Sequence, residues 1–203
     1  MKNIMMGTLI TGAFIATSLS GIANAASYDL DSAHTSVGFS VKHLGINNTK
    51  GAFQKFSGTF SYDPKKVEET KIRVEIATDS LDTGNPKRDE HVKSKDFLDA
   101  GKFPKITFVS KSVKANSDGF EVIGDLTIHG VTKSVALQVT DIAGPGVNPL
   151  DKKNHWGASA TGKIKRQDFG ITWNGGGATG IAGEAVIGDD VKLTFEIDGV
   201  EKT

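Results

Sequence analysis

Residues 120–139 read FEVIGDLTIHGVTKSVALQV, with apolar or small side chains at nearly every second position on both sides of His129-Gly130. A period of two is typical of a strand that turns one face to a core. Two such runs separated by a Gly-containing pair favour a tight connection between antiparallel strands. The stretch therefore predicts two neighbouring strands of an antiparallel sheet.

The same alternation recurs along most of the chain after residue 30. Short apolar runs of this kind, mostly at hairpin spacing and without a composition break, predict one all-β domain with about eight strands in a barrel or sandwich. The last two runs are expected to form a hairpin around Gly188-Asp189-Asp190. The predicted runs cover residues 37–43, 56–62, 72–76, 106–108, 120–128, 131–139, 156–164, 181–187 and 191–197.

Two segments interrupt the strand pattern. Between Asn85 and Asp99 the period of two is lost, Asn85 is a suitable helix cap and Pro86 suits the first helical position. This segment predicts a short helical crossover packed on the barrel. Residues 141–154 contain Gly-Pro-Gly and Asn-Pro, which predict a long loop at the rim of an opening.

The predicted inward face mixes aromatic and branched residues with small ones. An eight-stranded barrel is either filled by its side chains or holds one small ligand, so the size of these side chains decides between a packed core and a cavity. The small residues predict an apolar cavity, although glycines also mark bends and bulges in barrels. The small inward positions are Gly58, Gly124, Ala158, Ala160, Gly162, Gly183 and Ala185.

Composition excludes several classes of function. Lys plus Arg and Asp plus Glu both number 24, so the basic excess of a general nucleic-acid binder is missing. The chain has no Cys, which excludes a catalytic thiol, a disulfide framework and a thiolate metal site. The five His show no HExxH or similar spacing, and no G-x-S-x-G motif occurs. We therefore expect no metal, no cofactor and no catalysis.

The first 25 residues have the pattern of a secretory signal. Lys2 is their only charge, an apolar stretch follows, and Ala23-Asn24-Ala25 forms an A-x-A cleavage site. We expect cleavage near Ala25, a single domain over residues 26–203, and export to the periplasm of a Gram-negative bacterium.

Six ordered motifs carry a family resemblance. Together they closely resemble the YceI-like family of bacterial polyisoprenoid-binding proteins over essentially the whole mature chain. The motifs are DSAHTSVGFSVKHL at residues 31–44, GAFQKFSG at 51–58, RDEHV at 88–92 with Asp96-Phe97, FPKITF at 103–108, GDLTIHGVT at 124–132 and RQDFG at 166–170.

The resemblance implies an extended lipocalin-like antiparallel β-barrel of about eight strands with a long apolar tunnel. That tunnel would hold an isoprenoid or similar amphipathic lipid, such as a quinone or a polyprenyl phosphate, without catalysis. It further implies transient contact with a membrane or membrane protein for lipid delivery, and a homodimer. The alternative is a non-enzymatic stress-response or interaction module that uses the barrel as a scaffold. An enzyme of lipocalin-like fold ranks third and would need titratable groups converging inside the cavity.

Strand phase and the resemblance together predict the residues that contact the lipid. The expected headgroup contacts are His43, Arg88 and His91. The expected ligand-binding residues are Phe39, Val41, His43, Phe56, Gly58, Phe60, Ile72, Val74, Phe108, Leu126, Trp156, Ala160, Gly162 and Phe195.

Alternatives stay open at the polar positions. His43 could equally be a satisfied core or rim histidine. Arg88 could bind a headgroup or form an ion pair with Asp89, which we favour because an unpaired charge beside an apolar site is costly. Asp31 is expected to bond His34.

One further ion pair is predicted near the end of the chain. Arg166 and Asp168 precede Phe169-Gly170 at a strand-to-loop corner and are expected to form a pair that fixes the fold.

Overall fold

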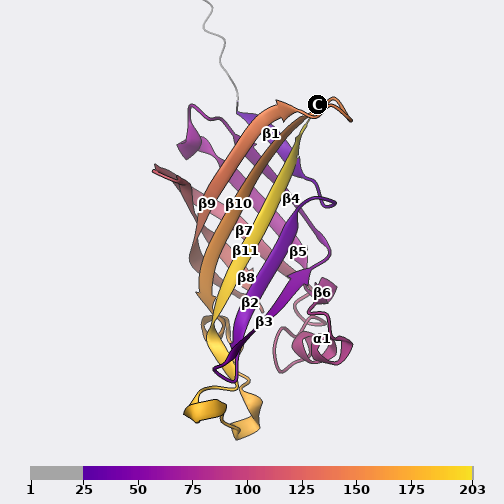
Figure 1. Ribbon diagram of the computed structural model, residues 1–203, viewed down its shortest axis with the longest axis vertical. Coiled ribbons are helices and arrows are strands. Elements are labelled where there is room, and N and C mark those ends of the chain that lie inside the picture. The colour runs from indigo at the N-terminus through magenta and orange to yellow at the C-terminus, as the bar shows by residue number, and fades with distance from the viewer. Residues whose placement is uncertain (1–24, 203) are drawn as a thin grey trace, which may run out of the picture.

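The structure is a computed structural model that describes residues 25–202 (Figure 1). The expected signal segment, apart from Ala25, lies outside the described residues. No helix of the described residues is long and apolar enough to cross a membrane.

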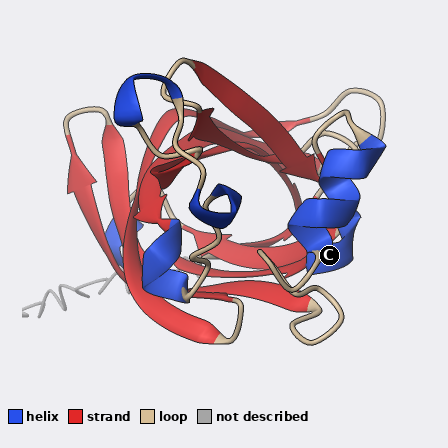
Figure 2. Ribbon diagram, turned by 90° about the horizontal axis from the view of Figure 1, so that it is seen from below, coloured by secondary structure: helices blue, strands red, loops and turns tan. Residues whose placement is uncertain are grey.

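Eight antiparallel strands close into a barrel, which confirms the predicted fold class. They follow one another in the sheet order β1-β4-β5-β7-β8-β9-β10-β11, and β11 pairs back with β1. Seen along the barrel axis, the strands form a ring around the lumen (Figure 2). Their bounds are β1 (Ala26–Leu30), β4 (Phe56–Tyr62), β5 (Lys71–Ala77), β7 (Lys105–Asn116), β8 (Gly119–Ile128), β9 (Val131–Val147), β10 (Asn154–Lys165) and β11 (Ile187–Glu201).

Three further strands extend the barrel at one end. The C-terminal part of β11 pairs with β1, whereas its N-terminal part pairs with β2 (Ser36–His43), so β1 and β2 lie one after the other along the same side of β11. β2 pairs with β3 (Asn47–Phe53), and β3 pairs with the short β6 (Leu81–Asp82). The helix α1 (Pro86–Lys93) lies beside β3 and β6 at this end (Figure 1).

The predicted helix is present. The Asn85 side chain accepts a hydrogen bond of 3.1 Å from the Arg88 backbone N–H, and Pro86 occupies the first turn. The helix ends at Lys93 because Ser94 has extended backbone angles. No residue of α1 is fully buried, so the helix depends on its cap and on contacts at one side.

Five single turns of 3-10 helix complete the described structure. They are η1 (Val67–Glu69), η2 (Thr78–Ser80), η3 (Arg166–Phe169), η4 (Gly175–Gly177) and η5 (Ile181–Gly183).

The predicted hairpin around Gly188-Asp189-Asp190 is wrong. These residues lie inside β11, where its pairing with β2 shifts register between Ile187 and Val191. Of the predicted strand before them, residues 181–186 form η5 and the coil after it, at the α1 end of the barrel, and only Ile187 belongs to β11 (Figure 1). The Gly-Asp-Asp sequence therefore marks a bulge, which local pattern alone does not distinguish from a turn.

The predicted long loop over residues 141–154 is also wrong. β9 continues to Val147 and β10 begins at Asn154, so only residues 148–153 connect them. The pairing of β9 with β10 contains two register irregularities near Gly157, which accommodate the Gly- and Pro-containing stretch within a strand.

The end of the barrel opposite α1 is filled by aromatic side chains. The rings of Tyr28 and Phe60 are stacked with centroids 4.9 Å apart, and Trp156 packs against Phe60 at 4.9 Å and against Tyr62 at 5.1 Å. Phe120 adjoins Tyr62, and all five side chains are buried. Aromatic packing therefore closes this end.

The predicted inward glycines of the strands do not face empty space, contrary to the prediction. A Cβ atom at Gly124 would collide with the Phe108 ring, and one at Gly51, a glycine outside the predicted set, would lie 2.5 Å from the Phe39 ring. Because a glycine has no side chain, the large side chain of a neighbouring residue can pack directly against its backbone on the inside of the barrel. Gly58 and Gly162 are covered in the same way by Leu30 and Leu137, Gly199 is covered by Phe60, and Gly183 and Ala185 lie outside the strands.

Candidate functional site

A cavity of about 330 Å³ occupies the α1 end of the barrel. Apolar side chains form most of its wall. Arg88 of α1 is both exposed to solvent and part of the lining, so the cavity opens to the surface beside α1. We call this cavity the mouth chamber. It is lined by Phe39, Val41, His43, Thr49, Phe53, Leu81, Thr83, Arg88, His91, Val92, Phe97, Leu98, Ile106, Ile128, Ile164, Arg166, Phe169, Ile171, Trp173, Val186, Ile187, Val191 and Leu193.

A second cavity of about 100 Å³ lies deeper in the barrel and ends at the aromatic cluster. We call it the deep chamber. Leu193 of β11 lines both chambers, so they are neighbours along the barrel axis. The deep chamber is lined by Leu30, Thr35, Val37, Phe60, Tyr62, Thr70, Ile72, Val74, Ile76, Phe108, Phe120, Val122, Leu126, Val135, Leu137, Val139, Trp156, Ala160, Leu193, Phe195 and Ile197.

The structure distributes the predicted ligand-binding residues over the two chambers. Phe39, Val41 and His43 line the mouth chamber. The predicted residues that line the deep chamber are Phe60, Ile72, Val74, Phe108, Leu126, Trp156, Ala160 and Phe195.

Three predicted residues line neither chamber. Gly58 and Gly162 are covered by leucines, as described above, and Phe56 packs at the edge of the core. Strand phase identifies an inward residue, but it does not show whether a neighbouring side chain lies over that residue.

The three predicted headgroup residues His43, Arg88 and His91 all line the mouth chamber. The other charged residue in its lining is Arg166, and no carboxylate of the described residues lines it. A cavity lined by cationic and neutral donors favours a ligand group with electron-rich oxygens.

The predicted ion pair between Arg88 and Asp89 is not formed within the described residues. Both side chains instead bind Thr83: Arg88 Nε donates to Thr83 Oγ1 at 2.7 Å, and a terminal guanidinium nitrogen donates to the Thr83 carbonyl at 2.7 Å. Asp89 accepts from the Thr83 hydroxyl and backbone N–H. The Thr83 hydroxyl lowers the pKa of Asp89. Thr83 therefore orients Arg88 at the mouth through two hydrogen bonds.

Arg166 has a different role from the predicted pair with Asp168. Its guanidinium donates four hydrogen bonds of 2.7–3.0 Å to backbone carbonyls, including those of Ile171, Trp173 and Ile187. Burial lowers the pKa of Arg166, and the neighbouring Asp189 opposes this shift. Carbonyl dipoles thus solvate a buried cation that ties the segment after β10 to the start of β11.

Aromatic contacts join α1 to this same segment. His91 lies edge-on to Trp173 at 4.8 Å between ring centroids and to Phe97 at 5.1 Å, and its Nε2 is 2.9 Å from Asp96 Oδ2. Phe169, Ile171 and Trp173 of this segment alternate and line the mouth chamber, but none is among the ligand-binding residues predicted above, and the sequence leaves Trp173 open as either a tunnel or a core residue. The alternation of these three apolar residues is visible in the sequence, but the predicted strand before them ends at residue 164.

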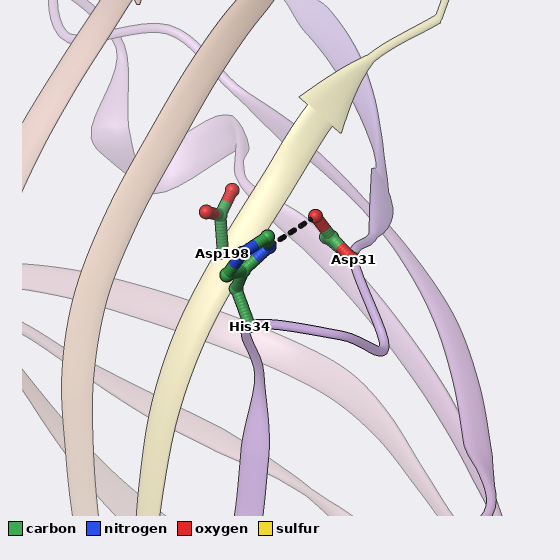
Figure 3. Close-up of side chains that lie close together, drawn as sticks. All are labelled: Asp31, His34 and Asp198. Carbon is green, nitrogen blue, oxygen red and sulfur yellow. Dashed lines mark hydrogen bonds and ion pairs between the residues drawn. The ribbon is translucent and has the colours of Figure 1, made fainter. Parts of the chain in front are cut away.

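A second polar cluster lies outside the closed end. His34 Nδ1 is 2.8 Å from Asp31 Oδ2, as expected from the sequence, and Asp198 lies beside them (Figure 3). One side-chain nitrogen or oxygen atom from each of Asp31, His34 and Asp198 lies within 4.8 Å of the other two.

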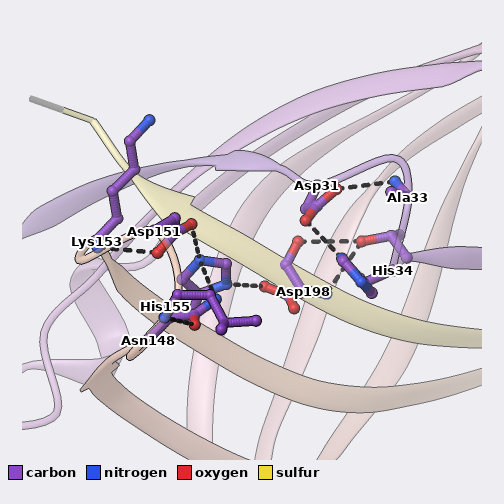
Figure 4. Close-up of polar contacts among 10 residues, drawn as sticks. Asp31, Ala33, His34, Asn148, Asp151, Lys153, His155 and Asp198 are labelled. Atoms are coloured by element: carbon purple, nitrogen blue, oxygen red, sulfur yellow. Dashed lines mark hydrogen bonds and ion pairs between the residues drawn. The ribbon is translucent and has the colours of Figure 1, made fainter.

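His155 extends this cluster. Its ring lies between Asp198, at 2.9 Å from Nδ1, and Asp151, at 2.8 Å from Nε2 (Figure 4). Hydrogen bonds within the cluster account for each of these side chains, so we interpret it as structural. His155 joins the β9–β10 connection to β11, and hydrogen bonds from the Asp31 backbone N–H and the Thr35 hydroxyl to the Asp198 carbonyl join the turn after β1 to β11.

Comparison with known sequences identifies relatives over the full length of the chain. The profile of the YceI-like domain matches residues 28–199. The chain is 38% identical over 197 residues to the UPF0312 protein YE1254 of Yersinia enterocolitica, covering 95% of this chain and 94% of the relative. It is 37% identical over 204 residues to protein YceI of Salmonella arizonae, with both chains covered completely.

Solved structures of similar proteins have the same fold. Burkholderia cenocepacia BcnA is 28% identical, with a TM-score of 0.70 over 83% of this chain and 98% of that one. The Campylobacter jejuni YCEI protein is 37% identical, with a TM-score of 0.64 over 86% and 97%. A polyisoprenoid binding domain from Saccharophagus degradans is 15% identical, with a TM-score of 0.59 over 88% and 99%, and that likeness concerns the fold alone. From its profile match, its relatives and its barrel, this chain belongs to the YceI-like family.

Proposed function

We propose that this protein is a periplasmic carrier or store for a polyisoprenoid or similar amphipathic lipid, such as a quinone or a polyprenyl phosphate. The observation that carries the proposal is the arrangement of the two chambers. An apolar interior leads inward from a mouth that bears His43, Arg88 and His91. An amphipathic chain matches this order of surfaces, with its tail inside and its polar group at the mouth.

The energetics favour a ligand with a long apolar chain. Each methylene group of the ligand that is buried contributes about 0.8 kcal/mol to the free energy of binding, although ordering the ligand offsets part of this gain. The scaffold alternative predicts a lumen filled by side chains, and two neighbouring cavities of about 330 and 100 Å³ argue against it.

Lipid exchange at the α1 end is part of the proposal. Ile46, in the turn between β2 and β3, is 63% exposed, and Ile181 of η5 is 54% exposed. The segments that carry them meet near Gly45. Exposed apolar side chains near the mouth would suit transient contact with a membrane or membrane protein. The homodimer expected from the sequence stays a prediction.

The experiment is to purify the protein from the periplasm of its source and identify extracted lipids by mass spectrometry. We expect one lipid class at close to one molecule per protein. The variant Arg88→Leu, purified in the same way, tests whether Arg88 binds the polar group of the lipid. If the variant is folded but no longer carries a lipid with an anionic group, the headgroup role of Arg88 is supported. A wild-type sample without stoichiometric lipid would count against the proposal.

A further inference from the structure

Two loops at the α1 end together form an exposed apolar surface. The segment between β10 and β11 projects beyond the strands, next to the turn between β2 and β3 (Figure 1). We call residues 44–47 and 174–186 together the tip. Ile46 in the first loop is 63% exposed and Ile181 in the second is 54% exposed. Ala178 and Ala185 of the second loop are exposed as well.

The two loops of the tip contact each other. The Leu44 backbone N–H donates a hydrogen bond of 2.9 Å to the Val186 carbonyl. A Cβ atom on Gly180 would lie only 3.1 Å from Leu44 Cα, so the backbones of the loops are packed closely. The exposed isoleucines therefore belong to one continuous surface.

The second loop is fixed at its base to the wall of the mouth chamber. The Asn174 side-chain oxygen accepts a hydrogen bond of 2.9 Å from the Ile187 backbone N–H. The guanidinium of Arg166 binds the Trp173 carbonyl before the loop and the Ile187 carbonyl after it. Trp173 and Val186 line the mouth chamber. A surface that contacts the tip is consequently next to the cavity.

The tip is almost free of charge. Charged residues make up 24% of the whole chain, but Glu184 is the only Asp, Glu, Lys or Arg of the tip. Basic residues attract a protein to anionic lipids, whereas apolar side chains bind to a bilayer of any charge by leaving water. The composition of the tip therefore favours contact driven by its isoleucines, without a requirement for anionic lipid.

The closed end of the barrel has the opposite character. Leu150 is 90% exposed there, but it lies in a connection that also contains Asp151, Lys152 and Lys153. Charged groups resist transfer from water into an apolar phase. The charged residues that line a surface cleft at this end are Asp29, Asp31, Asp151, Lys153, Glu201 and Lys202.

A bilayer suits the tip better than a protein partner does. Binding energy between proteins is concentrated in Trp, Tyr and Arg, and the tip contains none of these residues. A projection with two exposed isoleucines also offers little of the roughly 800 Å² that each partner buries in a standard protein interface. The interfacial region of a bilayer accepts exposed apolar side chains without a complementary shape.

We propose that the tip is a docking surface for a lipid bilayer, into which Ile46 and Ile181 insert, so that the protein approaches the membrane with its mouth first. This inference rests on the proposed lipid-binding function and assigns its membrane partner to the lipid itself. It implies docking that depends on neither anionic lipid nor salt.

The test places a fluorophore on the tip. The chain has no Cys, so Ile46→Cys and Ile181→Cys each provide a single site for a polarity-sensitive fluorophore. Leu150→Cys, labelled in the same way, is the matched control because this position is more exposed but lies at the closed end. The probes are protein-free vesicles of phosphatidylcholine, with and without phosphatidylglycerol, at low and high salt.

We expect the emission of the labels at residues 46 and 181 to shift to the blue with both kinds of vesicle and at both salt concentrations. The label at residue 150 should keep its aqueous emission. Because the vesicles contain no protein, this result would assign the surface to lipid rather than to a membrane protein.

A transfer assay measures what docking contributes to lipid exchange. The unlabelled double variant Ile46→Ser/Ile181→Ser should deliver a fluorescent anthroyloxy fatty acid to vesicles about fivefold more slowly than the wild type, since less apolar surface enters the bilayer. Its affinity for this probe should be unchanged, because neither isoleucine lines a chamber. Leu150→Ser should transfer the probe at the wild-type rate.

Three outcomes would overturn the docking surface. They are tip labels that shift with neither vesicle, a label at residue 150 that shifts as far as those at the tip, and a shift that requires phosphatidylglycerol and disappears at high salt. The labelling experiment needs no bound lipid. A protein that docks but binds no lipid would therefore contradict the proposed function alone, and one that binds lipid without docking would contradict this inference alone.

Discussion

At the residue scale, the most informative positions are the inward glycines, which have no side chain. Inward glycines provide room for phenylalanine and leucine side chains from neighbouring positions, so bulky residues cover the wall. The glycines therefore contribute to the cavity indirectly. An added methyl group would displace the neighbouring side chain into the space where a ligand would lie.

Gly51→Ala tests this relation in the mouth chamber. The new Cβ would lie 2.5 Å from the Phe39 ring and 3.0 Å from the Thr83 methyl group, so the ring has to move toward the chamber that it lines. We expect a folded protein that binds its lipid at least about tenfold more weakly, equivalent to about 1.4 kcal/mol. The measurement is a lipid titration of the two proteins.

Gly157→Ala is the matched control on β10. The nearest atom to its added Cβ is the Ile197 carbonyl oxygen at 3.6 Å, an ordinary contact. This variant should bind like the wild type. Equal binding by both variants would contradict the proposed role of the glycine on the wall.

The pH dependence of stability is a second prediction at the residue scale. Hydrogen bonds to Asp151 and then Asp198 raise the pKa of His155 above its ordinary value. Because the folded protein binds this proton more tightly than the unfolded chain, protonation stabilises the fold. The contribution is fully present below the unfolded pKa of about 6.5 and is lost as the pH rises through the folded pKa.

We therefore expect His155→Asn to lower the melting temperature most at pH ~5.5 and least at pH ~8.5. Thermal denaturation across this range measures the difference. His34→Asn is the comparison, since the pKa of His34 is raised by Asp31 but its side chain is 70% exposed, so its effect should be smaller. If His155→Asn lowered the melting temperature by the same amount at every pH, protonation of His155 would not be the source of the stabilisation.

At the scale of elements, α1 and the segment after β10 form the wall of the mouth where the strands do not. The helix has no fully buried residue, and its side chains meet the segment through His91 and Trp173. Local capping consequently matters more for this helix than for one that covers a core.

Asn85→Ala removes the cap and should destabilise α1 by about 1 kcal/mol. We expect faster amide hydrogen exchange in residues 86–93 and little change in the barrel strands. Asn85→Asp, which can accept the same hydrogen bond, should restore the slower exchange. Faster exchange throughout the barrel in Asn85→Ala would show that the helix does not open as a local unit.

At the scale of the whole molecule, β11 links the two halves of the barrel. Its two ends pair with different strands, and Leu193 lies at the border of both chambers. A chain that occupies both chambers has to pass this residue. Leu193→Trp should therefore weaken binding of long chains about tenfold or more while short chains bind nearly as before.

A series of fatty acids of increasing length, titrated against both proteins, measures this effect. Lys192→Trp places the same side chain at the neighbouring exposed position of β11 and is the control. A loss of affinity in Leu193→Trp that is the same at every chain length would indicate two chambers that do not share one ligand.

The amino-acid sequence by itself determined the local and repetitive features of this protein. Alternation identified most strands and the inward face, Asn85-Pro86 identified the start of the helix, and Asp31 identified the partner of His34. These features depend on neighbours within a few residues along the chain or across a strand, which pattern describes well.

Only the tertiary structure decided which residues the cavity reaches and which partners the polar groups have. Arg88 and Arg166 bind Thr83 and backbone carbonyls in place of nearby carboxylates, and Gly162 is covered by Leu137. Gly162 meets Leu137 across two neighbouring strands, and Arg166 meets Ile187 and Gly188 at the bulge in β11. Their contacts depend on register and on side-chain direction, and a one-residue shift changes both.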